Sequence, residues 1–158
     1  MLPQEVAQLM GKMGEVTIWE VEKGAIKKFA CATGDSNPLY RDEEYARNSR
    51  YGSIIAPPGF FGWPAKWEGL MPLASKLRDE LFAAFTEAGY GRIVDGGIEY
   101  DFFYPVRAGD ILSVSPKIID IRERETKGGK MFFSTIERSY INQNDTLVAK
   151  DRQTFIFR

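Results

Sequence analysis

Residues 32–46 read ATGDSNPLYRDEEYA, and they predict a rigid polar turn between two short helices. Gly34 tolerates the positive φ that such turns use. The side chains of Asp35 and Asn37 can accept hydrogen bonds from nearby backbone amides, and the proline that follows fixes the direction in which the chain leaves. The turn therefore holds two polar side chains in fixed directions.

A strand and two helices are predicted around this turn. The stretch EVTIWEV (15–21) has the alternation of a half-buried strand, and KGAIKKFACAT (23–33) places Ile26, Phe29 and Ala30 at helical spacing. The acidic residues that open DEEYARNS (42–49) suit a helix N-terminus. The single cysteine, Cys31, falls on the apolar side of the first helix and is expected to be a small buried hydrophobe.

Two further helices are predicted after the turn. YGSIIAPPGFFGWPAKW (51–67) approaches two prolines and then becomes aromatic, which favours a buried helix that begins near Gly59. SKLRDELFAAFTEAGYG (75–91) has apolar residues at amphipathic spacing and ends at a glycine, which indicates a packing helix.

From Arg92 onward the period changes to two. Four long strands are predicted within 92–106, 110–124, 130–142 and 146–158, joined by RAGD, ETKGG and NQND. The short joins predict sequential antiparallel neighbours. With the early strand they make a sheet of about five strands in an α+β fold, and the Pro58–Trp67 segment is the most apolar candidate for a helix that the sheet wraps around.

Composition narrows the class of protein. The 158 residues suffice for one core, so we expect one domain over 1–158. The 21 basic and 22 acidic residues nearly cancel, which argues against nucleic acid as a partner. No apolar run reaches the about 20 residues of a membrane span, and the N-terminus lacks the features of a signal peptide, so a cytoplasmic location is expected.

The absence of histidine removes several chemistries. The sequence has no histidine and one cysteine, which excludes histidine-based triads, a Cys-His pair and multi-cysteine metal sites. No metal site and no resident cofactor are predicted. The remaining chemistry has to use carboxylates, tyrosine, lysine, backbone amides or a partner chain.

Three ordered motifs, FACATGDSNPLYRDEEYA, YGSIIAPPGFF and YDFFYPVRAGDIL, resemble those of the MaoC-like acyl dehydratases and (R)-specific enoyl-CoA hydratases. The resemblance covers residues 16–157. It implies the hot-dog fold, an antiparallel sheet around a central helix, with acyl-thioester sites where two such units meet.

The resemblance also makes Asp35, Asn37 and Tyr40 the candidate catalytic positions. Catalytic members carry G-D-x-N-P, an apolar residue and a histidine, and here Tyr40 takes the place of that histidine. The unperturbed pKa of tyrosine is about 10, which makes it a poor substitute for proton transfer. We therefore expect Tyr40 to be vestigial or supporting, with a role in packing or in lining the acyl tunnel, and we expect Asp35 to cap local backbone amides rather than to act directly in catalysis.

The resemblance suggests a substrate-binding segment as well. Backbone amides near Gly59 and Phe60 could face a thioester oxygen, although a plain buried helix start fits equally well. Aromatic residues that could line an acyl pocket, with core packing as the more ordinary reading, are Phe60, Phe61, Trp63 and Trp67. Basic residues that could meet coenzyme A phosphates, and otherwise form a solvated face, are Lys23, Lys27, Lys28, Arg41, Arg47 and Arg50.

Within the family, two-module enzymes and heterodimers pair a unit that carries the full motif with one that lacks the histidine. The resemblance therefore implies a hydro-lyase subunit that is weak or inactive alone. Its expected partners are an acyl-CoA or acyl carrier protein thioester and a MaoC-like catalytic subunit, in a heterodimer or heterotetramer, with a homodimer possible in isolation. The alternatives are a hot-dog acyl-CoA thioesterase and a non-catalytic module that binds acyl thioesters.

Overall fold

Alternating apolar residues build one antiparallel sheet, and four of its five strands come from the second half of the chain. The computed structural model describes residues 2–60 and 75–158. Its strands are β1 (Thr17–Glu20), β2 (Ile93–Phe102), β3 (Ile111–Thr126), β4 (Gly129–Ile141) and β5 (Leu147–Phe157). They lie in the order β1-β3-β4-β5-β2, and every pairing is antiparallel. The predicted α+β class and five-stranded sheet are confirmed, and the arrangement is that of the hot-dog fold.

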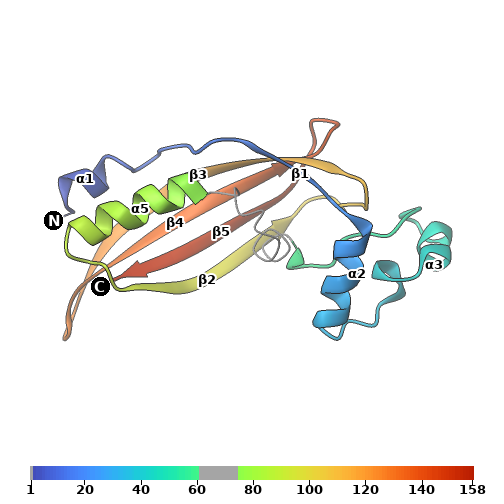
Figure 1. Cartoon of the computed structure of the whole chain (residues 1–158), viewed down its shortest axis with the longest axis horizontal. Coiled ribbons are helices and arrows are strands. Elements are labelled where there is room, and N and C mark those ends of the chain that lie inside the picture. The colour runs from blue at the N-terminus through green and yellow to red at the C-terminus, as the bar shows by residue number, and fades with distance from the viewer. Residues whose placement is uncertain (1, 61–74) are drawn as a thin grey trace.

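The helices of the described residues fall into two groups (Figure 1). Helix α5 (Ser75–Glu87) lies along the sheet, with the short α1 (Gln4–Ala7) near it. Helices α2 (Lys23–Ala32) and α3 (Glu43–Asn48), with the 3₁₀ turn Pro38–Tyr40 between them, lie beyond the opposite end of the strands. The GDSNP turn is therefore placed at one end of the sheet.

One predicted strand pairing is wrong. The strands on either side of RAGD are not neighbours, because β2 pairs with β5 while β3 pairs with β1 and β4. After β2 the chain leaves the sheet and pairs with the segment that precedes the two prolines. Ala56 N donates to Val106 O at 2.8 Å, and Ala108 N donates to Ile54 O at 3.0 Å. RAGD is therefore the end of the segment that connects β2 to β3, and it is not a hairpin turn between two paired strands.

Helix α5 covers the apolar face of the sheet at the end away from α2. Leu81 and Phe85 are fully buried, and the Phe85 ring stacks on Phe157 with a centroid separation of 3.8 Å. Phe132 and Phe157 belong to the same buried cluster. The helix predicted over Pro58–Trp67 falls mainly on residues 61–74, which lie outside the described residues.

The sequence also predicted which residues of α2 are buried. Ile26 and Ala30 are fully buried as expected, but Cys31 is exposed, and its sulfur accepts a hydrogen bond from Arg41 Nη2 at 3.4 Å. The expected burial of Cys31 is wrong because the helix turns this position away from the stripe that packs on the core.

In residues 2–60 and 75–158, no helix is both long and apolar enough to cross a membrane.

Candidate functional site

The GDSNP turn uses its own polar side chains to hold its shape. Gly34 has a φ of 72°, and the amide of Asp35 donates to Ala30 O at 2.8 Å. Asp35 Oδ1 accepts a hydrogen bond from the amide of Asn37 at 2.9 Å. Asn37 Oδ1 in turn accepts from the amide of Leu39 at 3.0 Å and caps the 3₁₀ turn. One carboxylate oxygen of Asp35 and the side-chain oxygen of Asn37 therefore accept hydrogen bonds from backbone amides.

Tyr40 lies at the end of this turn with its side chain in the core. Only 9% of the residue is exposed. Burial is the main cause that raises the pKa of its phenol above 10.0, followed by the charges of Asp35 and Tyr51, while a hydrogen bond with the Asn37 side chain acts in the opposite direction. At neutral pH Tyr40 is therefore protonated, so it can donate a hydrogen bond but cannot act as a general base.

A pocket of about 300 Å³ adjoins Tyr40. Its walls come from three segments that are distant in sequence: the 3₁₀ turn, the loop before the two prolines, and the chain just after β2. The lining residues are Tyr40, Ile55, Ala56, Pro58, Phe102, Phe103, Tyr104, Pro105 and Val106. The lining residues are all apolar or aromatic and none is charged, which suits the acyl part of a ligand better than a charged group.

The predicted substrate-binding residues divide into three groups. Gly59 has a φ of 83° in the turn after the two prolines, beside Pro58 of the pocket. Phe60 is fully buried between Trp19 and Phe29, with ring centroids 5.5 and 5.8 Å away, and its amide donates to Pro57 O at 3.2 Å. The remaining three, Phe61, Trp63 and Trp67, lie outside the described residues.

The structure adds a pocket wall that the sequence reasoning did not select. Phe102, Phe103 and Tyr104 are 46%, 49% and 59% exposed, which is unusual for large apolar side chains. The signal was present in the aromatic run of YDFFYPV, but period-two reasoning assigned that run to a strand. Only the tertiary structure shows that the run ends beside Tyr40.

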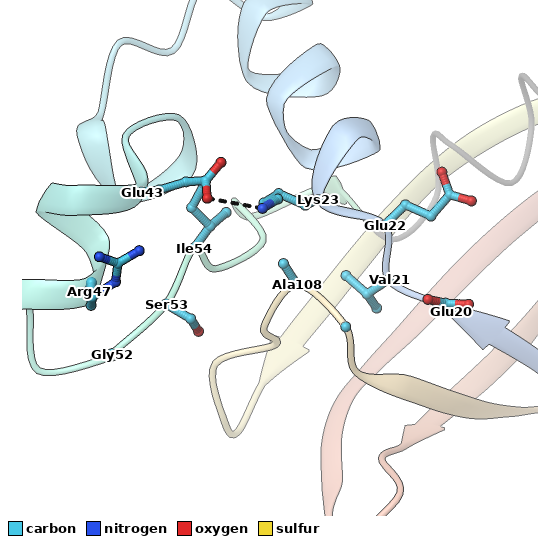
Figure 2. A pocket seen from close by; sticks show the side chains of 11 residues that line it. Glu20, Val21, Glu22, Lys23, Glu43, Arg47, Gly52, Ser53, Ile54 and Ala108 are labelled. Carbon is cyan, nitrogen blue, oxygen red and sulfur yellow. Dashed lines mark hydrogen bonds and ion pairs between the residues drawn. The ribbon is translucent and has the colours of Figure 1, made fainter.

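A second, larger cleft of about 580 Å³ is lined by residues of α2 and α3 and of the loop segments around them (Figure 2). Figure 2 shows Lys23 of α2 bonded to Glu43 of α3, with Arg47 on the same helix as Glu43. Lys27 also bonds Glu43, and these two lysines lower the pKa of the carboxyl to about 2. Lys23 and Lys27 are thus already paired, which leaves Arg47 as the cation in this lining without an ion pair among the described residues.

Comparisons with known proteins agree with this fold. The family model "FAS1-like, dehydratase domain region" matches residues 8–151. A UPF0336 protein of Streptomyces avermitilis is 36% identical over 105 residues, which cover 66% of this chain and 64% of that protein. A probable enoyl-CoA hydratase alpha subunit of Thermomonospora curvata is 32% identical over 133 residues, 80% of this chain and 41% of that protein. The chain thus spans less than two thirds of these relatives.

Solved structures give the same fold at lower identity. A chain of the ChsH1-ChsH2 complex from Mycobacterium tuberculosis superposes with a TM-score of 0.75 at 21% identity, over 97% of this chain and 93% of that one. A MaoC-like dehydratase superposes with a TM-score of 0.77 at 18% identity, over 96% of this chain and 43% of that one. With a family match over most of its length and this fold, the chain belongs to the FAS1-like dehydratase domain region family, a MaoC-like hot-dog family.

Proposed function

We propose that this chain is the histidine-lacking subunit of an enoyl-CoA hydratase or (3R)-hydroxyacyl-CoA dehydratase, and that it pairs with a MaoC-like partner that carries the complete Asp-His motif. The observation that carries the proposal is Tyr40. It stands where the catalytic histidine is found in the motif, it is buried, and its raised pKa keeps it protonated.

Hydration of an enoyl thioester needs more than this turn offers. Water adds its hydroxyl to C3 and a proton goes to C2, so one group has to accept a proton and another has to deliver one while the thioester oxygen carries developing charge. Asp35 is a single carboxylate with one oxygen bound to the Asn37 amide. The partner supplies the proton-transfer pair, and this chain supplies the apolar wall formed by Tyr40 and the residues after β2.

The comparisons support a hydratase subunit without deciding its partner. One relative is named as the alpha subunit of a probable enoyl-CoA hydratase, and this chain matches 41% of its length. One of the similar solved structures is a complex of two different proteins, ChsH1 and ChsH2. Both facts favour an assembly in which this fold is one of two parts.

The substrate is an acyl thioester, and the reaction needs only water besides. The pocket beside Tyr40 is apolar enough for the acyl group, whereas phosphates of coenzyme A would need cations that are not already paired. Lys23 and Lys27 are bound to Glu43, so Arg47 is the better candidate for binding a phosphate among the basic residues around the 580 Å³ cleft. Because Arg47 lines the 580 Å³ cleft, we infer that the polar end of the thioester binds in this cleft.

A second candidate is a non-catalytic module that binds acyl thioesters. It is favoured by the commitment of both Asp35 and Asn37 to backbone amides, which makes the turn self-sufficient as a folding element. Such a module binds acyl-CoA in calorimetry and adds no turnover to any partner.

Co-expression tests the proposal. A small MaoC-like protein encoded nearby and carrying G-D-x-N-P-x-H is produced with this chain, and the hydration of crotonyl-CoA is followed for the complex and for each chain alone. The expected result is a stable complex with hydratase activity and an isolated chain without it. Full activity of this chain alone contradicts the proposed division of labour, and an inactive complex that still binds acyl-CoA favours the second candidate.

A further inference from the structure

The face of the sheet that points away from α5 carries a row of basic and apolar side chains. Phe132 and Phe157 contact Phe85 of α5, so they define the inner face. Neighbouring positions along a strand point to opposite faces, and residues opposite each other on paired strands share a face. The strand register therefore places in one row on the outer face, across β3, β4, β5 and β2, the residues Arg122, Phe133, Ile156 and Val94.

A second row on the outer face brings arginines together. Arg124 follows Arg122 at the next outward position of β3. Arg92 and Arg158 are directly opposite each other, because each backbone amide donates to the other residue's carbonyl at 3.0 Å. Residues in such a pair have Cα atoms about 5.5 Å apart. Like charges in this arrangement are destabilising, so an anion that binds both guanidinium groups would relieve the repulsion.

The carboxylates near these arginines are already bound. Asp120 Oδ2 lies 3.3 Å from Arg122 Nε, and Glu123 Oε1 lies 2.6 Å from Lys130 Nζ. In contrast, no ion pair within residues 2–60 and 75–158 involves the other arginines of this face, which are Arg92, Arg124 and Arg158. We call the outer-face patch the set of Arg92, Arg122, Arg124, Arg158, Phe133 and Ile156.

Part of the outer-face patch is hollow. A pocket of about 300 Å³ is lined by Arg122, Glu123, Arg124 and Phe133. The guanidinium carbon of Arg122 lies 5.9 Å from the centroid of the Phe133 ring, and Asp120 binds the same guanidinium. Two contacts thus orient this group before any ligand binds. Guanidinium groups match phosphate oxygens with two parallel hydrogen bonds, and the ring beside them offers an apolar surface.

The outer-face patch is separate from the pocket beside Tyr40. A bulge in β2 reverses the faces of that strand, so Phe102 lies opposite the buried Ala149, whereas Val94 lies opposite Ile156 on the outer face. Along the strand, Phe102 and Val94 are about 26 Å apart. A ligand on the outer-face patch therefore does not occupy the acyl pocket.

We propose that the outer-face patch binds a phosphate ester, with its phosphate on the arginines and its organic part on Phe133 and Ile156. A phosphate group carries about two negative charges at neutral pH, which compensates the opposed Arg92 and Arg158 better than the single charge of a carboxylate. A soluble nucleotide and the head group of an anionic phospholipid share this chemistry. The inference goes beyond the proposed function, because neither the acyl pocket nor the catalytic motif takes part.

Calorimetric titration at low ionic strength tests the site, with ADP and inorganic pyrophosphate as the probes. Arg124→Gln and Arg92→Gln each remove one cation from the outer-face patch. Lys117→Gln is the matched control, because Lys117 is an exposed cation of β3 opposite Glu137, on the same face. Thermal unfolding without ligand checks the fold, and Arg92→Gln is expected to be at least as stable as wild type because it removes a like-charge pair.

Each arginine variant is expected to bind ADP about tenfold more weakly than wild type, and Lys117→Gln is expected to match wild type. Pyrophosphate is expected to bind more weakly than ADP. Equal affinity for the two probes would overturn the role of Phe133 and Ile156. No acyl thioester is used, so these results do not depend on hydratase activity.

Phosphatidylcholine vesicles with and without phosphatidic acid distinguish the two sources of the phosphate. Binding of ADP with the expected losses supports a soluble nucleotide. Co-sedimentation that requires phosphatidic acid and is lost in Arg124→Gln, without ADP binding, supports a lipid head group. Binding of neither probe, or an equal loss in Lys117→Gln, would overturn the proposal.

Discussion

Arg138 and Asp151 form a buried ion pair on the inner face of the sheet, with Nε 2.8 Å from Oδ1. Tyr140 Oη donates to Asp151 Oδ2 at 2.6 Å, and Arg138 Nη2 donates to Gln153 Oε1 at 3.1 Å. Asp151 is also the cross-strand neighbour of Tyr100 on β2. The pair therefore ties β4 to β5, directly beside the strand whose end forms the pocket wall.

Replacing Arg138 with methionine is expected to destabilise the protein by about 3–5 kcal/mol, because the buried carboxylate of Asp151 loses the cation that compensates it. Urea unfolding followed by circular dichroism measures the change. Lys76→Met is the control, since its ion pair with Glu15 is more than 70% exposed on both sides and its loss is expected to leave stability unchanged. Equal stability of the two variants would show that the Arg138 pair contributes nothing.

Two glycines make a matched test of the packing between the N-terminal segment and the sheet. A Cβ at Gly14 would lie 2.8 Å from Pro116 Cγ and 3.1 Å from Leu77 Cβ, whereas a Cβ at Gly24 meets no atom within 4 Å. Gly14→Ala is expected to cost about 1–3 kcal/mol. Gly24→Ala, inside α2, is expected to stabilise by up to about 1 kcal/mol. Thermal unfolding of both variants gives the comparison, and a neutral Gly14→Ala would contradict the close approach.

The Glu43 carboxylate is expected to titrate at about 2, because Lys27 and Lys23 both bind it. A folded-state pKa below the unfolded value stabilises the contact above the unfolded pKa, and this contribution is lost as the pH falls from about 4.5 through about 2. NMR titration of the side-chain carboxyl measures it. In Lys23→Met/Lys27→Met the pKa is expected to return toward 4.5, and no change in that double variant would rule out the two lysines as the cause.

Local chemistry in the sequence was enough to predict the elements around the turn. The GDSNP signature gave the backbone hydrogen bonds of Asp35 and Asn37, and the acidic start of α3 coincides with capping by Asp42. Period-two patterning located the four long strands because their inner residues face one buried side of the sheet. These features depend on residues close in the chain, where spacing is informative.

Longer-range features were not predictable in the same way. The pairing of β2 with β5 depends on where residues 103–110 go after the strand, and their hydrogen bonds to Ile54 and Ala56 have no local signal. The pocket wall at Phe102 to Tyr104 was missed for the same reason. Cys31 shows a third limit, because a residue next to the buried stripe of a helix can point either into the core or away from it.

Tyr40→His restores the second titrating group of the motif, yet we expect little or no hydration of short enoyl-CoAs by the isolated variant. Position 40 is buried in the core, and Asp35 Oδ1 is already held by the Asn37 amide. A general acid or base contributes about 10²- to 10⁴-fold only when it is correctly placed, and a displacement of about 1 Å can cost about 10²-fold. Tyr40→Phe controls for folding. A gain of 10²-fold or more in Tyr40→His would show a complete site that lacks one residue.

The most direct test compares the two halves of the proposed complex with one substitution in each. Asp35→Asn in this chain keeps an oxygen that can accept from the Asn37 amide, and in the partner the motif histidine is changed to alanine. Initial rates of crotonyl-CoA hydration are measured for both complexes. We expect a loss of at least about 10²-fold from the partner substitution and only a few-fold change from Asp35→Asn. A loss of 10²-fold or more from Asp35→Asn, with the complex intact, would contradict the proposed division of labour by placing the catalytic carboxylate in this chain.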